Sequence, residues 1–196
     1  MSDTTECSTV SRLLSLRLQV CLIGALASSF YGAAFGQGMM QDRVVLQAVG
    51  LFQHSCLPFA GYAGNLRQWA ASKNLMELPD SVAQPFLSGA AGKAFNASTA
   101  DGKLILLSRD DGACMVISPY GNRQHADDAL LGVFRTVGAA TTLVRDSVSP
   151  DGKAEQTLEK VTLQQRAWHV SVTGLRHPED SSSPSNLILM ATATPP

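Results

Sequence analysis

Two short apolar runs on either side of an Asp-Gly turn constrain the fold of this chain more than any other stretch. The runs cover residues 103–108 (KLILLS) and 113–118 (ACMVIS), and the turn between them is residues 109–112 (RDDG). An Asp-Gly pair between two strand-like runs is a strong signal for a β-hairpin. Alternate side chains of a strand point to opposite faces, and both sets are apolar here. We therefore expect this hairpin to be covered on both faces or to lie centrally in its sheet.

Helices are predicted before the hairpin. Apolar residues recur at helical spacing over residues 39–56, and Pro58 and Gly61 end that helix. A second helix is predicted over residues 63–75, and a short third one over residues 79–87. The segment before the hairpin is therefore expected to supply helices rather than strands.

After the hairpin the sequence predicts one long helix and then strands. Asp127 is a suitable N-cap, and an apolar stripe with helical spacing continues from Leu130 to Val144. Strands are predicted over residues 155–163, 166–175 and 187–193.

The strand over residues 166–175 alternates clearly between apolar and polar positions. Its apolar side chains, Trp168, Val170 and Val172, share one face, and its polar side chains, His169, Ser171 and Thr173, share the other. This pattern is typical of an antiparallel strand with one face in the core and one in solvent. The chain is therefore predicted to be α+β, with an antiparallel sheet of about five strands packed with N-terminal helices and one central helix.

The N-terminus has the order of a secretory signal peptide. Arg12 and Arg17 precede an apolar run over residues 18–27, and small residues follow up to Gly36. We expect residues 1–36 to be a signal peptide and residues 37–196 to be a single exported domain, periplasmic or secreted. An uncleaved membrane anchor is the alternative, because the run from Leu18 approaches the length of a membrane span.

If the chain is exported, its four cysteines have different fates. Cys7 and Cys21 would leave with the signal, and Cys56 and Cys114 would remain. Two cysteines in an oxidising compartment most often form a disulfide. Two other interpretations stay open: a pair of buried free thiols, or a reactive or metal-binding cysteine with His54 nearby.

Composition and motifs exclude several functions. Lys and Arg number 15 and Asp and Glu 16, without a basic run, so neither nucleic acid nor, after signal removal, a membrane is an expected partner. The sequence has no Gly-x-Ser-x-Gly, no Cys-x-x-Cys and no His-Glu-x-x-His motif. We therefore predict no metal and no cofactor.

Few residues are candidates for chemistry. His125 with Asp127 or Asp128 could form a base with an orienting carboxylate, although acidic residues also favour the first turn of a helix. His169 could meet a second histidine in space or lie at the surface. The two tryptophans, Trp69 and Trp168, are expected to be core anchors rather than ligand platforms.

One resemblance to known proteins can be named. Cys56-Leu-Pro58, Trp69 and Asp111-Gly-Ala-Cys114 resemble a group of small exported bacterial proteins and lipoproteins of uncharacterised function, over about residues 45–175. The chain lacks the lipid-attachment cysteine of the lipoprotein members. The resemblance implies export and cysteine pairing, and it carries no catalytic residues.

The sequence thus favours a non-enzymatic binding protein of the bacterial envelope, with an envelope protein or a wall polymer as partner. Polar loops could present the contacts, with candidate residues Tyr120, Asn122, Arg123, His125 and His177. The alternatives are a small exported hydrolase using His125 with Asp127 or Asp128, and a purely structural envelope component.

Overall fold

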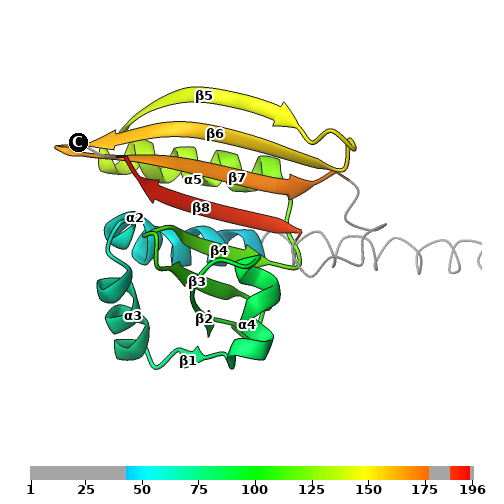
Figure 1. Ribbon diagram of the computed structural model, residues 1–196. Helices are drawn as coiled ribbons and strands as arrows, with labels where there is room; N and C mark the ends of the chain where they lie inside the picture. Colours follow the sequence, from blue (N-terminus) through cyan, green and yellow to red (C-terminus); the bar gives the residue numbers. More distant parts are fainter. Residues whose placement is uncertain (1–42, 177–185, 195–196) are drawn as a thin grey trace, which may run out of the picture. The chain divides into compact units, whose positions relative to one another are not determined.

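The computed structural model describes residues 43–176 and 186–194. These residues form one antiparallel sheet with helices packed against it. The sheet has eight strands in the order β1-β2-β3-β4-β8-β7-β6-β5 (Figure 1). The α+β prediction is confirmed, whereas the predicted count of about five strands is wrong. The predicted signal peptide, residues 1–36, lies outside the described residues.

The elements follow one another as a mostly helical half and a mostly extended half. The helices are residues 43–54, α2 (Cys56–Phe59), α3 (Ala63–Ser72), α4 (Asp80–Leu87) and α5 (Arg123–Val137). The strands are β1 (Met76–Glu77), β2 (Gly92–Asn96), β3 (Ile105–Arg109), β4 (Cys114–Ser118), β5 (Ala140–Val148), β6 (Ala154–Leu163), β7 (Arg166–Leu175) and β8 (Leu187–Ala193).

The sheet consists of two meanders that meet in its centre. Strands β1 to β4 pair in sequence, strands β5 to β8 pair in sequence, and β4 pairs with β8. All seven neighbouring pairs of strands in this sheet are antiparallel. Helix α5 makes the one long crossing, from β4 in the centre to β5 at the edge.

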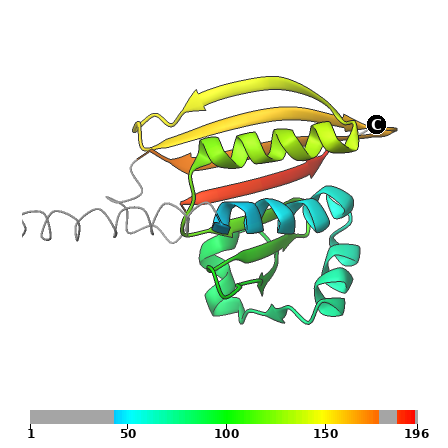
Figure 2. The ribbon, with the colours of Figure 1, turned by 180° about the vertical axis from the view of Figure 1, so that it is seen from behind.

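Helices cover the two faces of the sheet unequally. Figure 2 shows the helix of residues 43–54 and α5 lying across one face. Helix α4 packs on the other face, where Ala83 and Leu87 meet Ala94, Leu107 and Ile117 of the strands. Within the described residues, no helix covers that second face over β5 to β8 (Figure 1). The β3–β4 hairpin is thus covered on both sides, as its apolar pattern predicted.

The predicted strand count is wrong because β1, β2 and β5 were not recognised. The apolar stripe suggested a helix as far as Val144, but α5 ends at Gly138, which has a left-handed conformation with φ of 73°. Residues of β5 such as Thr141 and Val144 are β-branched and continue the helical spacing only by coincidence. The predicted start at Asp127 is also wrong: α5 begins at Arg123, and the N-cap is Asn122.

The predicted disulfide between Cys56 and Cys114 is confirmed, and it joins α2 to β4. Beside it, the Gly61 N–H donates to the Gly112 carbonyl at 2.8 Å. A Cβ atom on Gly112 would lie 2.9 Å from the Gly61 Cα, so only glycine permits this approach of two backbones. Covalent bond and close contact together hold the loop after α2 on the tip of the β3–β4 hairpin.

A bilayer-spanning helix is not found in the part of the chain that the structure describes. The disulfide is compatible with the oxidising compartment that the sequence predicts.

Candidate functional site

The uncovered face of strands β5 to β8 is the largest part of the sheet that no described element covers, and we call it the open face. Its side chains are Thr142, Arg145 and Ser147 of β5, Gln156, Leu158, Lys160 and Thr162 of β6, Ala167, His169, Ser171 and Thr173 of β7, and Ile188, Met190 and Thr192 of β8. The opposite side chains of β7, Trp168, Val170 and Val172, are buried in the core beneath α5. The predicted assignment of side chains to the two faces of this strand is therefore confirmed, but on the face expected in solvent Ser171 is buried and His169 and Thr173 are half-buried.

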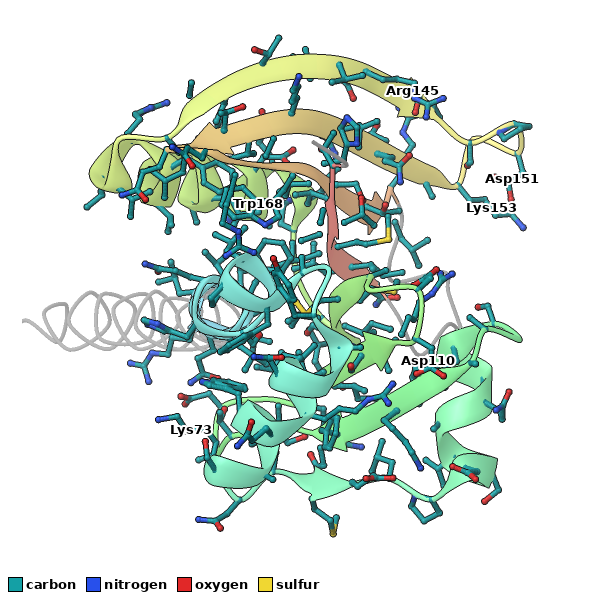
Figure 3. All side chains as sticks on the ribbon, turned by 60° about the vertical axis from the view of Figure 1, so that its left-hand side comes forward. Lys73, Asp110, Arg145, Asp151, Lys153 and Trp168 are labelled. Carbon is teal, nitrogen blue, oxygen red and sulfur yellow. A yellow bond between two sulfur atoms is a disulfide. The ribbon has the colours of Figure 1, made fainter. Side chains whose placement is uncertain are left out.

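Three basic side chains gather on the open face because of the strand register. Lys160 of β6 lies directly opposite His169 of β7, so that their Cβ atoms are roughly 4.5–5.5 Å apart. Arg145 of β5 lies opposite Leu158, which places it diagonally from Lys160, at roughly 7–8 Å. Figure 3 labels Arg145 on β5 and Trp168 on the side of the sheet toward the helices.

The open face carries no carboxylate among the described residues. Asp146, Glu155 and Glu159 of β5 and β6 all point to the other side, toward α5. The side chains of Arg145, Lys160 and His169 form no hydrogen bond or ion pair with a described residue. The basic side chains of the open face are therefore available to an external anion.

Hydroxyl and amide groups surround the basic side chains. Thr142, Lys160, His169 and Thr192 form one row across four strands. Gln156 donates to Thr173 at 3.1 Å, and Ser171 is buried between its neighbours. Such rows offer hydrogen-bond donors and acceptors to a polar ligand lying across the strands.

The acidic groups on the α5 side form a partly buried ion network instead. Arg123 Nη1 lies 2.7 Å from Asp127 Oδ2, and Nη2 lies 3.3 Å from Glu155 Oε2. Arg123 also donates to Thr157, whose hydroxyl donates to Asp127 at 3.0 Å. Burial raises the pKa of Asp127, against the lowering effect of the Thr157 hydrogen bond and the Arg123 charge. The network fastens the start of α5 to β6.

The predicted hydrolase residues His125, Asp127 and Asp128 all lie in the N-terminal part of α5. The His125 backbone N–H donates to the Asn122 side chain at 3.1 Å, and the His125 side chain is exposed on the first turn of α5. Asp127 faces the ion network, whereas Asp128 is exposed and accepts from Gln124. His125 lies on the α5 side of the sheet and His169 on the open face, so the two histidines do not converge.

The other predicted contact residues have varied surroundings. Tyr120 is 53% exposed, Asn122 caps α5, and Arg123 belongs to the ion network. His177 lies outside the described residues. Among the residues that the structure describes, no group of three or more His, Cys, Asp or Glu side chains could hold a metal ion.

Sequence reasoning missed Arg145 and Lys160. Lys160 lies in a predicted strand, but its partner on the neighbouring strand could not be inferred, because pairing depends on register. Arg145 lies just beyond a stretch that looked helical.

Comparisons with protein families, with curated proteins and with solved structures find no match for this chain. The resemblance to small exported bacterial proteins therefore stays an expectation.

Proposed function

We propose that this protein is an exported, non-enzymatic binding protein of the bacterial envelope, and that its open face binds an anionic wall polymer. The observation that carries the proposal is the convergence of Arg145, Lys160 and His169 on a sheet face without a carboxylate. Basic groups of one sign on a common surface attract an anionic chain and raise its rate of association. Arg145 can in addition bind a carboxylate or phosphate in bidentate fashion.

The character of the open face favours a polymer over a folded protein partner. Protein interfaces are centred on aromatic anchors, and the open face contains no Trp, Tyr or Phe. Its threonine and serine hydroxyls suit instead a hydrated polar chain that exchanges hydrogen bonds with water for hydrogen bonds with the sheet.

The disulfide supports the exported part of the proposal. A bond such as that between Cys56 and Cys114 persists in oxidising compartments and is rare in the cytosol. The signal peptide expected over residues 1–36 would deliver the chain to such a compartment.

Affinity electrophoresis of the full-length chain through gels with and without alginate, a polysaccharide of carboxylated sugars, tests the proposal. The wild type is expected to be retarded by alginate and not by neutral dextran. The double variant Arg145→Ala, Lys160→Ala should lose most of this retardation, with an affinity about tenfold lower or more, since each charged hydrogen bond contributes about 1.5–3 kcal/mol.

The matched control is the double variant Arg135→Ala, Lys103→Ala. Arg135 and Lys103 are also exposed, form no ion pair with described residues, and lie outside the open face. Equal loss of retardation in both double variants would show only net-charge attraction and overturn the proposal. Cleavage of a wall polymer that His125→Ala abolishes would overturn it in favour of the hydrolase.

A further inference from the structure

A groove separates the helix of residues 43–54 from α3, and the proposed function does not use it. Gly50, Leu51 and His54 line it from the first helix, and Trp69 and Lys73 line it from α3 and its C-cap. Its volume is about 440 Å³. Pockets for small molecules have volumes of roughly 300–1,000 Å³, so the groove has room for a small ligand, which would keep one side in solvent because the groove is broadly open.

The disulfide holds the walls of this groove in place. Cys56, bonded to Cys114, begins α2, and Phe59 at the end of α2 packs against the Trp69 ring with 6.3 Å between ring centroids. This contact supports the Trp69 ring, which also lines the groove. A ligand that stacked on Trp69 would therefore meet a fixed ring.

The lining combines an apolar wall with basic groups that have no partner. Leu51 and Trp69 supply the apolar surface, and both pack partly against the main core. His54 and Lys73 form no hydrogen bond or ion pair through their side chains with a described residue, and no carboxylate lines the groove. Gly50 adds no side chain, and a Cβ atom there would meet nothing within 4 Å.

We propose that this groove binds a small carboxylic acid with an aromatic body. The aromatic group would pack on Trp69 and Leu51, and the carboxylate would accept from the Lys73 ammonium, with His54 as a second donor. Charge complementarity favours the acid, because only a carboxylate gains the attraction of the exposed Lys73 ammonium. This proposal is independent of the open face.

Intrinsic fluorescence provides the test, since the chain has two tryptophans and Trp168 is only 5% exposed. The full-length chain is titrated with 4-phenylbutyrate and, separately, with the uncharged analogue 4-phenylbutanol. We expect saturable quenching by the acid and about tenfold weaker binding of the alcohol. Trp69→Phe should remove the quenching.

The variant Lys73→Met keeps the apolar stem and removes the charge, and it should weaken 4-phenylbutyrate about tenfold. Lys103→Met is the matched control, because Lys103 is exposed and lies outside the groove, and it should leave binding unchanged. Equal affinity for acid and alcohol, or an unchanged affinity in Lys73→Met, would overturn the proposal. The double variant Arg145→Ala, Lys160→Ala should bind 4-phenylbutyrate normally, which separates this test from that of the open face.

Discussion

In the two halves of the molecule, helices are attached to the antiparallel sheet in different ways. In the N-terminal half, residues 43–118, a disulfide ties the helical segment to the sheet, and helices cover both faces. In the C-terminal half, residues 123–194, an ion network ties α5 to β6, and one face is left open. The half with the covalent bond carries the groove, and the half with the ion network carries the open face.

The number of covered faces determines where each half can expose a binding surface. Covering both faces of β2 to β4 buries apolar side chains such as Leu106 and Leu107 on opposite sides. Strand β7 has one apolar face, toward α5, and strands β5 to β7 place polar and basic residues on the other face of the sheet. The stability of the C-terminal half therefore depends more on the contacts between α5 and the sheet, and Arg123 is the central group of these contacts.

Besides the pairing of β4 with β8, the side chain of Arg166 links the two halves. Arg166, at the start of β7, donates to the Pro58 carbonyl at 3.0 Å. Its guanidinium lies 4.9 Å from the centre of the Trp168 ring and 5.5 Å from that of Tyr62. These contacts join the loop after α2 to the C-terminal meander, so a loss of stability in one half should be felt in the other.

The largest effect is expected from removing the covalent fastening. The double variant Cys56→Ser, Cys114→Ser should lose about 4 kcal/mol of unfolding free energy, because the bond closes a long loop. Its sequence separation is 58 residues. Urea denaturation of the variant and of the unreduced wild type measures the loss. An unchanged midpoint would mean that the N-terminal half does not depend on the bond.

Removing the ion network around Arg123 should cause the second-largest loss of stability. Arg123→Met leaves Asp127 and Glu155 without their partner, and breaking such a partly buried network costs up to about 3 kcal/mol. The matched control is Arg109→Met, because Arg109 pairs with Asp111 at the surface and its loss should cost less than about 1 kcal/mol. Equal losses in the two variants, measured by thermal and urea unfolding, would contradict a special role for the network.

Disturbing the backbone contact between Gly61 and Gly112 should have the third-largest effect on stability. Gly112→Ala places a Cβ atom 2.9 Å from Gly61 Cα, whereas at Gly152 a Cβ atom would meet nothing within 4 Å. Both glycines have positive φ, so both substitutions carry a backbone cost of about 1–2 kcal/mol. Gly112→Ala should therefore destabilise more than Gly152→Ala. The difference between their unfolding midpoints isolates the contact that holds the loop on the hairpin.

The sequence predicted those features that depend on local pattern. The β3–β4 hairpin follows from an Asp-Gly turn between apolar runs, and the two faces of β7 follow from strict alternation around His169. Export and the count of remaining cysteines predicted the bond between Cys56 and Cys114. Each of these inferences needs only neighbouring residues or a count.

What could not be predicted depends on register and on tertiary packing. The helical spacing up to Val144 hid β5, because β-branched residues fit either period and only Gly138 marks the break. The pairing of Lys160 with His169 follows from the β6–β7 register, and the ion network follows from how α5 packs on β6. The groove likewise requires the packing of two helices whose sequences give no sign of it.

The smallest effect concerns Glu159, whose carboxylate lies in the crevice between α5 and the sheet beside Asp127. Burial, and then the charge of Asp127, raises the pKa of Glu159 above its ordinary value of 4.5. The folded state therefore binds the Glu159 proton more tightly than the unfolded state does. Between 4.5 and the raised pKa, stability falls as the pH rises, and the penalty is complete above the raised pKa.

Glu159→Gln removes the charge, so the variant should be more stable than the wild type at neutral pH, by no more than about 0.5 kcal/mol. The gain should disappear below pH 4.5, where the wild-type carboxyl is protonated in both states. Glu77→Gln is the control, because Glu77 accepts from Lys93 at 2.7 Å and its neutralisation should lower stability at neutral pH. Urea midpoints of the three proteins at several pH values measure these differences. A loss of stability in Glu159→Gln at neutral pH would mean that the charge of Glu159 stabilises the C-terminal half, and the ion network beneath α5 would then extend further than Arg123.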